Sequence, residues 1–218
     1  MEKRFTLTVI IFALIVTGMQ QNDLPTVDQI MSDLKVANDA LQSIEASFIQ
    51  EETNEFGDVE TTTGHFYFLS PGRYMLNSIF DGKVNEEMGK NAKYAWRIRH
   101  HLGSVDKFKV KESDQVSEGF LFTDADELNS AFDLKLLGVE KLESGDAYHL
   151  KGKAREKRKI REIEIWINVE SPAPIAKAIS YQKRKTTMIT FNNIKRDVKL
   201  DSDMFVYRVP RGYQEINH

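Results

Sequence analysis

Stretches in which apolar and polar residues alternate follow one another through most of this 218-residue chain, and they constrain its fold more than any other feature. Within residues 61–69, Phe66 and Phe68 fall on one face of an extended segment and Tyr67 on the other. Successive side chains of a strand point to opposite faces, so the alternation predicts a strand with one face on a core. Turn-forming residues then follow, as at 70–73 (Ser-Pro-Gly-Arg), which favours hairpins.

The same pattern along the chain predicts about ten or eleven strands at short spacing, which is typical of a large antiparallel sheet. No internal repeat, low-complexity stretch or linker interrupts it. A sheet of this length must curl or be covered, because long flat edges aggregate. The predicted fold is mainly β with a few helices (α+β): an incomplete antiparallel β-barrel lidded by helices. The predicted strands are residues 45–50, 61–69, 74–79, 94–98, 108–110, 139–142, 147–151, 160–169, 175–181, 186–191 and 204–209.

One longer helix is predicted before the first strand. Thr26 stands where an N-cap is expected, and Gln29 three residues later completes a capping box. Apolar residues then recur at helical spacing, which predicts an amphipathic helix over 26–44. A second, short helix is predicted from Thr123 to about residue 132. Two helices are too few to cover both faces of the sheet, so we expect them to close one opening.

The first 21 residues have the pattern of a secretory signal peptide and are expected to lie outside the fold. Lys3 and Arg4 precede an uncharged apolar run over 5–16, as in exported proteins. The alternative is a membrane anchor, but this run forms a helix of only about 18 Å, short of the ~30 Å hydrocarbon core. Residues 22–218 are then one exported domain, without lipidation because the chain has no Cys.

Composition and motifs exclude several classes of function. The absence of Cys excludes disulfides, a thiolate nucleophile and Cys-ligated metal sites. The formal net charge of −3 argues against nucleic acid as a partner. The sequence has no nucleophile-elbow, phosphate-loop, dinucleotide or zinc-protease motif. We therefore expect a protein that is not an enzyme and that uses neither a metal nor another cofactor.

Two groups of residues have the chemistry of metal ligands, and neither predicts a metal site. His100 and His101 are adjacent, so on a strand their side chains point to opposite faces and cannot hold one ion. Residues 124–127 (Asp-Ala-Asp-Glu) lack the glycine and the distal Glu of a calcium loop. A helix cap is the favoured interpretation of that segment.

A strongly basic stretch covers residues 151–161. A solvated hairpin tip is the simpler interpretation, because Lys and Arg protect sheet edges from aggregation. The functional alternative is a contact with anionic lipid head groups or an acidic partner surface, to which each cation contributes about 1 kcal/mol. A second basic tip at 183–185 adds to it if the two hairpins lie side by side. The candidate contact residues are Lys157, Arg158, Lys159 and Arg184.

Large apolar side chains recur on consecutive predicted strands. Core packing alone explains any one of them. A curled sheet covered by only two helices can also enclose an apolar cavity, as in barrels that carry lipids, and both interpretations stay open at this point. The residues concerned are Phe48, Phe66, Phe68, Tyr74, Leu76, Tyr94, Trp96 and Ile98.

Several segments, in the same order, resemble the periplasmic outer-membrane lipoprotein carrier family. Residues 44–50 (IEASFIQ) are similar to the family's A-S-F-x-Q segment after the first helix, and residues 64–74 (GHFYFLSPGRY) to its strand–turn–strand motif. Residues 91–96 (NAKYAW) resemble its hairpin that ends in Trp, and residues 190–191 and 204–212 (MFVYRVPRG) its C-terminal pattern. Together these matches extend over nearly the whole mature chain.

The resemblance implies an open β-barrel with an apolar cavity that takes the acyl chains of lipoproteins. Members receive acylated lipoproteins from an inner-membrane ABC transporter and hand them to an outer-membrane acceptor. Burial is worth about 0.8 kcal/mol per CH₂, so a dry cavity can carry acyl chains through water. The expected protein is a periplasmic, monomeric carrier and chaperone. Its cavity residues, by position in the motifs, are Phe48, Phe66, Phe68, Tyr74, Leu76 and Trp96.

Two positions depart from the family's pattern. An Arg often stands immediately before the turn proline, where this chain has Ser70, and Arg73 lies three residues after Ser70 and does not inherit its role. The Asp-Gly of the hairpin that ends in Trp is Asn91-Ala92 here. These departures concern the gating mechanism more than the fold and indicate a divergent member.

Two rival functions stay open. A carrier or sensor of another envelope amphiphile, such as a glycolipid, uses the same fold. An envelope hydrolase or lectin needs converging carboxylates or a metal on the concave face in place of an aromatic lining. The family's acceptor-type relative is disfavoured, because it is lipidated and this chain has no Cys.

Overall fold

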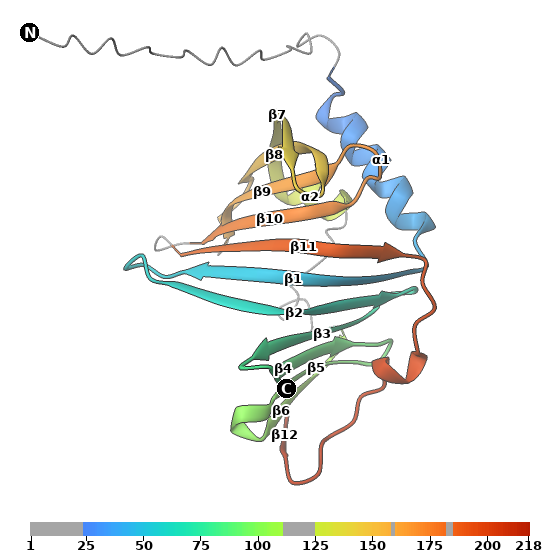
Figure 1. The fold of residues 1–218 in the computed structure, drawn as a ribbon, viewed down its shortest axis with the longest axis vertical. Coiled ribbons are helices and arrows are strands. Elements are labelled where there is room, and N and C mark those ends of the chain that lie inside the picture. Colours follow the sequence, from blue (N-terminus) through green and yellow to red (C-terminus); the bar gives the residue numbers. More distant parts are fainter. Residues whose placement is uncertain (1–23, 111–124, 158–159, 182–184) are drawn as a thin grey trace, which may run out of the picture.

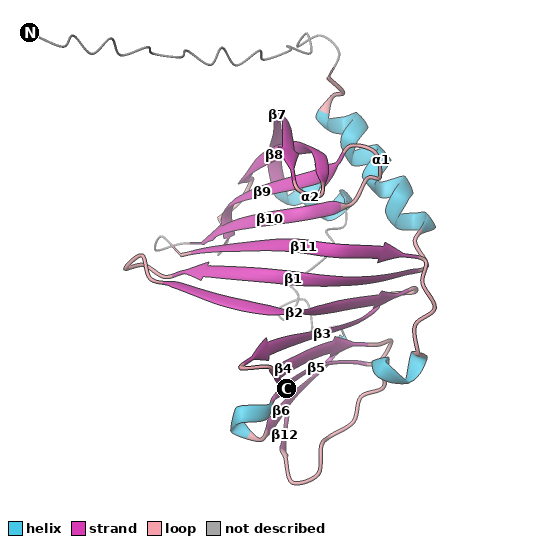
Figure 2. Ribbon diagram, viewed as in Figure 1, coloured by secondary structure: helices cyan, strands magenta, loops and turns pink. Residues whose placement is uncertain are grey.

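The computed structural model describes residues 24–110, 125–157, 160–181 and 185–218, so the predicted signal peptide (1–21) lies outside the described residues. Within these ranges twelve strands form one open sheet, with helices against one face (Figure 1, Figure 2). The spatial order is β12-β6-β5-β4-β3-β2-β1-β11-β10-β9-β8-β7, antiparallel throughout except for the β12–β6 pair. The elements are α1 (Val27–Ala40), β1 (Ser43–Thr53), β2 (Val59–Leu69), β3 (Arg73–Phe80), β4 (Lys83–Lys90), β5 (Tyr94–Arg99), β6 (Ser104–Lys109), α2 (Ala125–Ala131), β7 (Phe132–Leu142), β8 (Gly145–Ala154), β9 (Ile160–Asn168), β10 (Pro174–Tyr181), β11 (Thr186–Arg196) and β12 (Gln214–Asn217), with 3₁₀ turns at His100–Leu102 and Ser202–Phe205.

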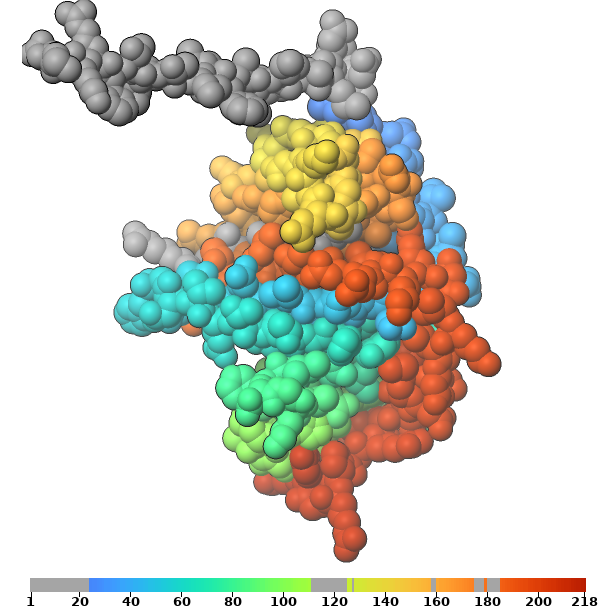
Figure 3. All heavy atoms as spheres, viewed as in Figure 1, coloured from blue at the N-terminus to red at the C-terminus, as the bar shows by residue number. Residues whose placement is uncertain are grey.

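This architecture confirms the predicted fold class, a mainly β protein built on a curled, open antiparallel sheet with few helices (Figure 3 shows the same view with all heavy atoms). The helices pack on one face of the sheet, which we call the inner face. Met31 and Leu34 of α1 and Leu128 of α2 form a buried cluster with β8 and β9 residues that include Leu150 and Ile165. Burial of each such side chain is worth roughly 1.5–3 kcal/mol, so this cluster fixes both helices on the sheet.

Helix α1 begins as predicted and ends earlier than predicted. The Oγ1 of Thr26 accepts a hydrogen bond from the backbone N–H of Gln29 at 3.2 Å, which is an N-cap. The helix stops at Ala40, and Ile44, expected at the end of its apolar stripe, is a buried residue of β1. The spacing of the apolar residues at this junction is compatible with both a helix and a strand, so it did not show where the helix ends.

Several strand assignments differ from the prediction, and β6 and β7 begin at Ser104 and Phe132, well before the predicted starts at 108 and 139. β4 and β12 were not predicted, because β4 (KVNEEMGK) is mostly polar and the residues of β12 are all exposed. The strand predicted over 204–209 is wrong. Its first residues belong to the 3₁₀ turn Ser202–Phe205, in which Phe205 is buried as a single anchor.

The two edge strands of the sheet differ in length and in how they pair. β7 is long, and its ladder with β8 shifts register between Leu136 and Gly138, which is a β-bulge. β12 is short and runs parallel to β6, where the Nζ of Lys107 lies 3.2 Å from an Oε1 of Glu215. Both edges are therefore irregular or charged.

Gly64 allows an aromatic ring to lie flat across β2. Its neighbour on β1 is Phe48, and a Cβ at Gly64 would come within 2.6 Å of the Phe48 Cζ and still closer to the backbone oxygen of Asn77. A glycine inside a strand often marks such a close approach. The position therefore excludes any side chain.

We expect Gly64→Ala to lower the free energy of unfolding by about 2 kcal/mol, because the added methyl overlaps Phe48 and the β3 backbone. Urea unfolding followed by circular dichroism measures this change. Thr63→Ala, at the neighbouring position, is the control and should change stability by less than about 0.5 kcal/mol. Equal effects of the two substitutions would contradict the proposed overlap.

Candidate functional site

Five of the six predicted cavity residues lie together on the inner face. The strand register pairs Phe66 with Leu76 and Phe68 with Tyr74 across β2 and β3, and Phe48 with Phe191 across β1 and β11. All belong to one apolar cluster, in which the Phe66 and Phe191 rings meet edge to face at 6.2 Å. Together the five form an apolar strip across β1–β3, and we define this strip as Phe48, Phe66, Phe68, Tyr74 and Leu76. Whether the strip lines a cavity stays a prediction.

The surroundings of Tyr74 are strongly apolar. Its side chain is 7% exposed, and burial raises the pKa of its phenol to about 12, because desolvation penalises the phenolate. Phe68 beside it is half-buried. In the strip, the partly exposed ring of Phe68 therefore lies next to the buried ring of Tyr74.

Trp96 lies on the opposite face from the strip. The register places it beside Gly89, and Gly89 beside Met75, so it belongs to the outer face. The chain that follows β11 covers it, with the Tyr207 ring 5.5 Å from the Trp96 ring. The prediction that Trp96 shares a cavity with the other five residues is therefore wrong. Because β4 was not predicted, the sequence did not show which residues of β5 share a face with the apolar residues of β2 and β3.

The inner face becomes charged at β4–β6, a feature that sequence reasoning missed. The row that contains Phe66 and Leu76 continues through Met88 to Arg97 and Asp106. Two ion pairs, Arg97–Glu86 at 2.8 Å and Arg99–Asp106 at 2.5 Å, hold this region, which we call the charged border. His218 also contacts Asp106 at 3.0 Å. The sequence signal for this border was that Arg97 and Arg99 alternate with the apolar residues Trp96 and Ile98. The inner face is thus amphipathic along the sheet.

Of the predicted contact residues, only Lys157 can be placed, and it is exposed in the β8–β9 turn, while Arg158, Lys159 and Arg184 lie outside the described residues. Part of the basic stretch is neutralised, since Lys151 lies 2.8 Å from Glu164 and 3.4 Å from Glu162. The antiparallel order puts the β8–β9 and β10–β11 turns at the same end of the sheet (Figure 1).

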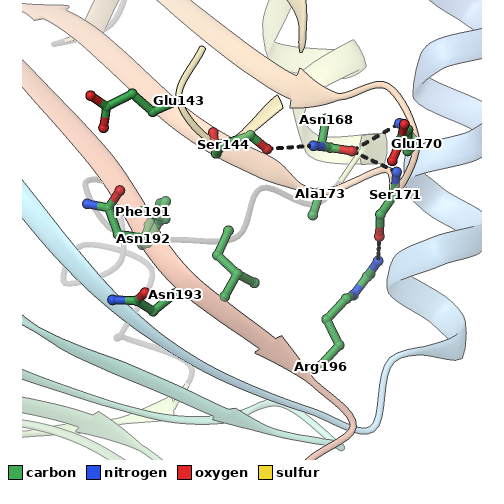
Figure 4. Close-up of a pocket in the computed structure, with 11 residues that line it drawn as sticks. Glu143, Ser144, Asn168, Glu170, Ser171, Ala173, Phe191, Asn192, Asn193 and Arg196 are labelled. Atoms are coloured by element: carbon green, nitrogen blue, oxygen red, sulfur yellow. Dashed lines mark hydrogen bonds between the residues drawn. The ribbon is translucent and has the colours of Figure 1, made fainter. Parts of the chain in front are cut away.

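Arginine contacts near the helices also differ from the family pattern. Arg73 donates from Nη2 to the carbonyl oxygen of Ser70 at 3.1 Å, so it closes its own turn. Arg196, at the end of β11, reaches α1 by a 3.5 Å contact from Nη2 to the carbonyl oxygen of Ala37, and it donates from Nη1 to the Oγ of Ser171 at 2.9 Å (Figure 4). Arg196 is a sheet-to-helix link that no sequence motif indicated.

The outer face carries a polar network around a buried histidine. His149 lies between two carboxylates, with Nδ1 2.6 Å from Glu140 and Nε2 2.9 Å from Glu164. Its ring stacks on Trp166 at 4.3 Å, and the indole Nε1 donates to Glu140 at 2.8 Å. A hydrogen bond from Trp166 chiefly lowers the pKa of Glu140, and a hydrogen bond from Lys151 chiefly lowers that of Glu164. The folded protein thus favours both ionised carboxylates.

His100 and His101 lie in a 3₁₀ turn and not on a strand. His100 contacts Glu87 at 2.7 Å and the Tyr213 hydroxyl at 3.0 Å, while His101 is exposed. Across the described ranges, no three His, Asp or Glu side chains are grouped so that they could hold a metal ion. Within the same ranges no helix combines the length and the apolar character needed to span a bilayer.

The inner face thus combines an open sheet, an apolar strip and packed helices. The family model described as "Outer membrane lipoprotein carrier protein LolA" matches residues 39–208. The chain therefore belongs to the LolA family, whose members bind lipids or lipoproteins and are not enzymes.

Solved structures share the fold at low sequence identity. An uncharacterized conserved protein from Thermus thermophilus has a TM-score of 0.60 at 14% identity, over 88% of this chain and 98% of that one. MucB in the Pseudomonas aeruginosa MucA/MucB complex has a TM-score of 0.51 at 13% identity, over 83% of this chain and 60% of that one. At such identities the likeness shows the fold alone. No curated protein sequence matches the chain.

The polar network makes stability depend on pH in a defined direction. Because the pKa values of Glu140 and Glu164 are lowered from 4.5 in the folded state, their contribution is fully present above that value. It is lost as the pH falls through their folded-state pKa values. We expect the stability difference between the wild type and Glu140→Gln to be larger at pH 7 than at pH 3.

Urea unfolding at both pH values measures this difference, and Glu156→Gln, in the exposed β8–β9 turn, is the control variant. A Glu140→Gln effect of the same size at pH 7 and pH 3 would show that the carboxylate charge does not stabilise the fold.

Proposed function

We propose that this protein is a periplasmic carrier that binds lipoproteins by their acyl chains and shuttles them from an inner-membrane ABC transporter to an outer-membrane acceptor. The apolar strip of the inner face carries this proposal, because five large apolar side chains from three adjacent strands share one face. Membership of the lipoprotein carrier family supports it. The predicted signal peptide supports export, since a carrier of this kind must work between the two membranes.

The strip supplies the kind of surface that an acyl chain needs. Transfer of each CH₂ from water to an apolar site is worth about 0.8 kcal/mol. The half-buried Phe68 next to the buried Tyr74 offers a starting contact for a chain that enters along the sheet. The open sheet lets the bound chain leave again, which a closed barrel would hinder. Transfer requires that bound and released states differ by only a few kcal/mol.

The charged border favours a second candidate, a carrier or sensor of another envelope amphiphile such as a glycolipid. Arg97 is the more accessible arginine of this border, at 42% side-chain exposure, and it lies in the same row as Leu76 and Met88. A polar head group on this border and an acyl chain on the strip would occupy one amphipathic face. The two candidates share the strip and differ in what is attached to the acyl chain.

We expect Phe68→Glu to weaken binding of a fluorescent fatty acid and of a triacylated peptide by at least about tenfold, because a carboxylate in the strip disfavours acyl chains. Tyr67→Glu is the matched control: Tyr67 neighbours Phe68 in sequence and, pairing with Met75, faces outward. It should bind like the wild type. Fluorescence titration measures both variants, with circular dichroism as the test of folding.

Equal affinities of the wild type and Phe68→Glu would overturn the strip as the acyl site. Affinity purification of the wild type from native periplasm, followed by mass spectrometry, then separates the two candidates. Acylated proteins support the lipoprotein carrier, and lipids without protein support the second candidate. Recovery of neither kind of molecule would overturn both.

A further inference from the structure

Trp166 of β9 borders a pocket on the outer face of the sheet. The indole is fixed from two directions: its ring stacks on His149 at 4.3 Å with an interplanar angle of 17°, and its Nε1 donates to Glu140 at 2.8 Å. His149 is itself held between Glu140 and Glu164. A ring held in this way is a preorganised flat surface.

A pocket of about 290 Å³ lies against Trp166 on the side away from His149. The register row runs from His149 on β8 through Trp166 on β9 and Ala176 on β10 to Thr190 on β11, and the pocket lining includes both Trp166 and Thr190. His149 therefore supports one side of the indole, and the pocket lies toward the other.

The pocket continues into a second one of about 510 Å³, because Glu143, Ser144 and Asn192 line both. The β10–β11 ladder ends at Ala176 and Thr190, so the sheet divides there and β11 separates from the tips of the neighbouring hairpins. Figure 4 shows Glu143 and Ser144 on one side of this opening and Asn192 on the other. We call the joined pockets the outer groove, whose inner end is lined by Phe191 and Ile194 of the apolar cluster.

The outer groove presents planar polar groups that the fold leaves available. Across the described residues, no hydrogen bond or ion pair engages the side chain of Glu143 or of Asn192. The carboxylate accepts and the amide both donates and accepts. By contrast Asn168 is committed to its turn, since its Oδ1 accepts from the backbone N–H groups of Glu170 and Ser171 (Figure 4).

We propose that the outer groove binds a saccharide, with one sugar ring stacked on Trp166 and its hydroxyls bound by Glu143 and Asn192. A pyranose ring has an apolar face of C–H groups and a rim of hydroxyls that donate and accept. An aromatic plane flanked by a carboxylate and an amide matches both features. The combined pockets have the size and the mixed lining of small-molecule sites, and their length suits an oligosaccharide.

The chemistry of the site disfavours a cationic ligand. The two ring nitrogens of His149 contact the carboxylates of Glu140 and Glu164, and its ring covers one face of Trp166. The carboxylate of Glu140 is also already engaged by Trp166 and His149.

Titration of the full mature protein with tetrasaccharides of glucose and of N-acetylglucosamine tests the proposal, with a tetralysine peptide as the cationic probe. Tryptophan fluorescence gives the readout, because Trp166 borders the groove whereas Trp96 is buried elsewhere and reports folding. We expect saturable binding of at least one saccharide. Trp166→Ala, followed by calorimetry, and Asn192→Ala should each weaken binding by about tenfold.

Glu162→Gln, on the same strand as Trp166 and outside both pockets, is the matched control and should bind like the wild type. Phe68→Glu should also bind like the wild type, because it alters the other face of the sheet. Failure of both saccharides to bind, binding that survives Trp166→Ala, or preference for tetralysine would overturn the proposal. Trp166, Asn192 and Glu162 lie outside the apolar strip, so these three variants test the outer groove separately from the acyl-chain site.

Discussion

The pairing of β1 with both β2 and β11 is the constraint on which the rest of the structure depends. β1 joins the first hairpins of the chain to its last long strand, so one ladder connects segments almost 150 residues apart, such as Ser47 and Asn192. Because side chains alternate along a strand, the register of this ladder decides which residues face the helices. A slip of one residue would exchange Phe48 with Ile49 and reverse the chemistry of both faces. The apolar strip and the outer groove are therefore two results of one register.

The sequence predicted the fold class and most strands because alternation is a local signal. It also grouped all five residues of the strip, since Phe66, Phe68, Tyr74 and Leu76 lie on one predicted hairpin whose turn is evident at Ser70-Pro71-Gly72. The prediction for Trp96 was wrong because the face on which it lies depends on β4, where the polar residues Asn85, Glu86 and Glu87 obscure the alternation of a strand. The face on which a residue of β5 lies can be deduced from β2 and β3 only when the intervening strand, β4, is recognised.

Contacts between distant segments could not be predicted at all. The charged border needs β4, β5 and β6 side by side before Arg97 meets Glu86 and Arg99 meets Asp106. The polar network likewise brings Glu140, His149 and Glu164 together from three strands, although His149 is isolated in the sequence. Such groups have no spacing rule, because their proximity follows from the tertiary register and not from the chain.

An open sheet has two edges that a closed barrel lacks, and this matters for how the protein behaves among its own copies. Exposed edges invite pairing with another chain. Here β7 is bent by its bulge and β12 is short, parallel and bordered by the Lys107–Glu215 pair. Neither edge offers a long flat template for a further strand. The bulge at one end and the short parallel strand at the other therefore oppose edge-to-edge pairing between copies, which is how a sheet can remain incomplete.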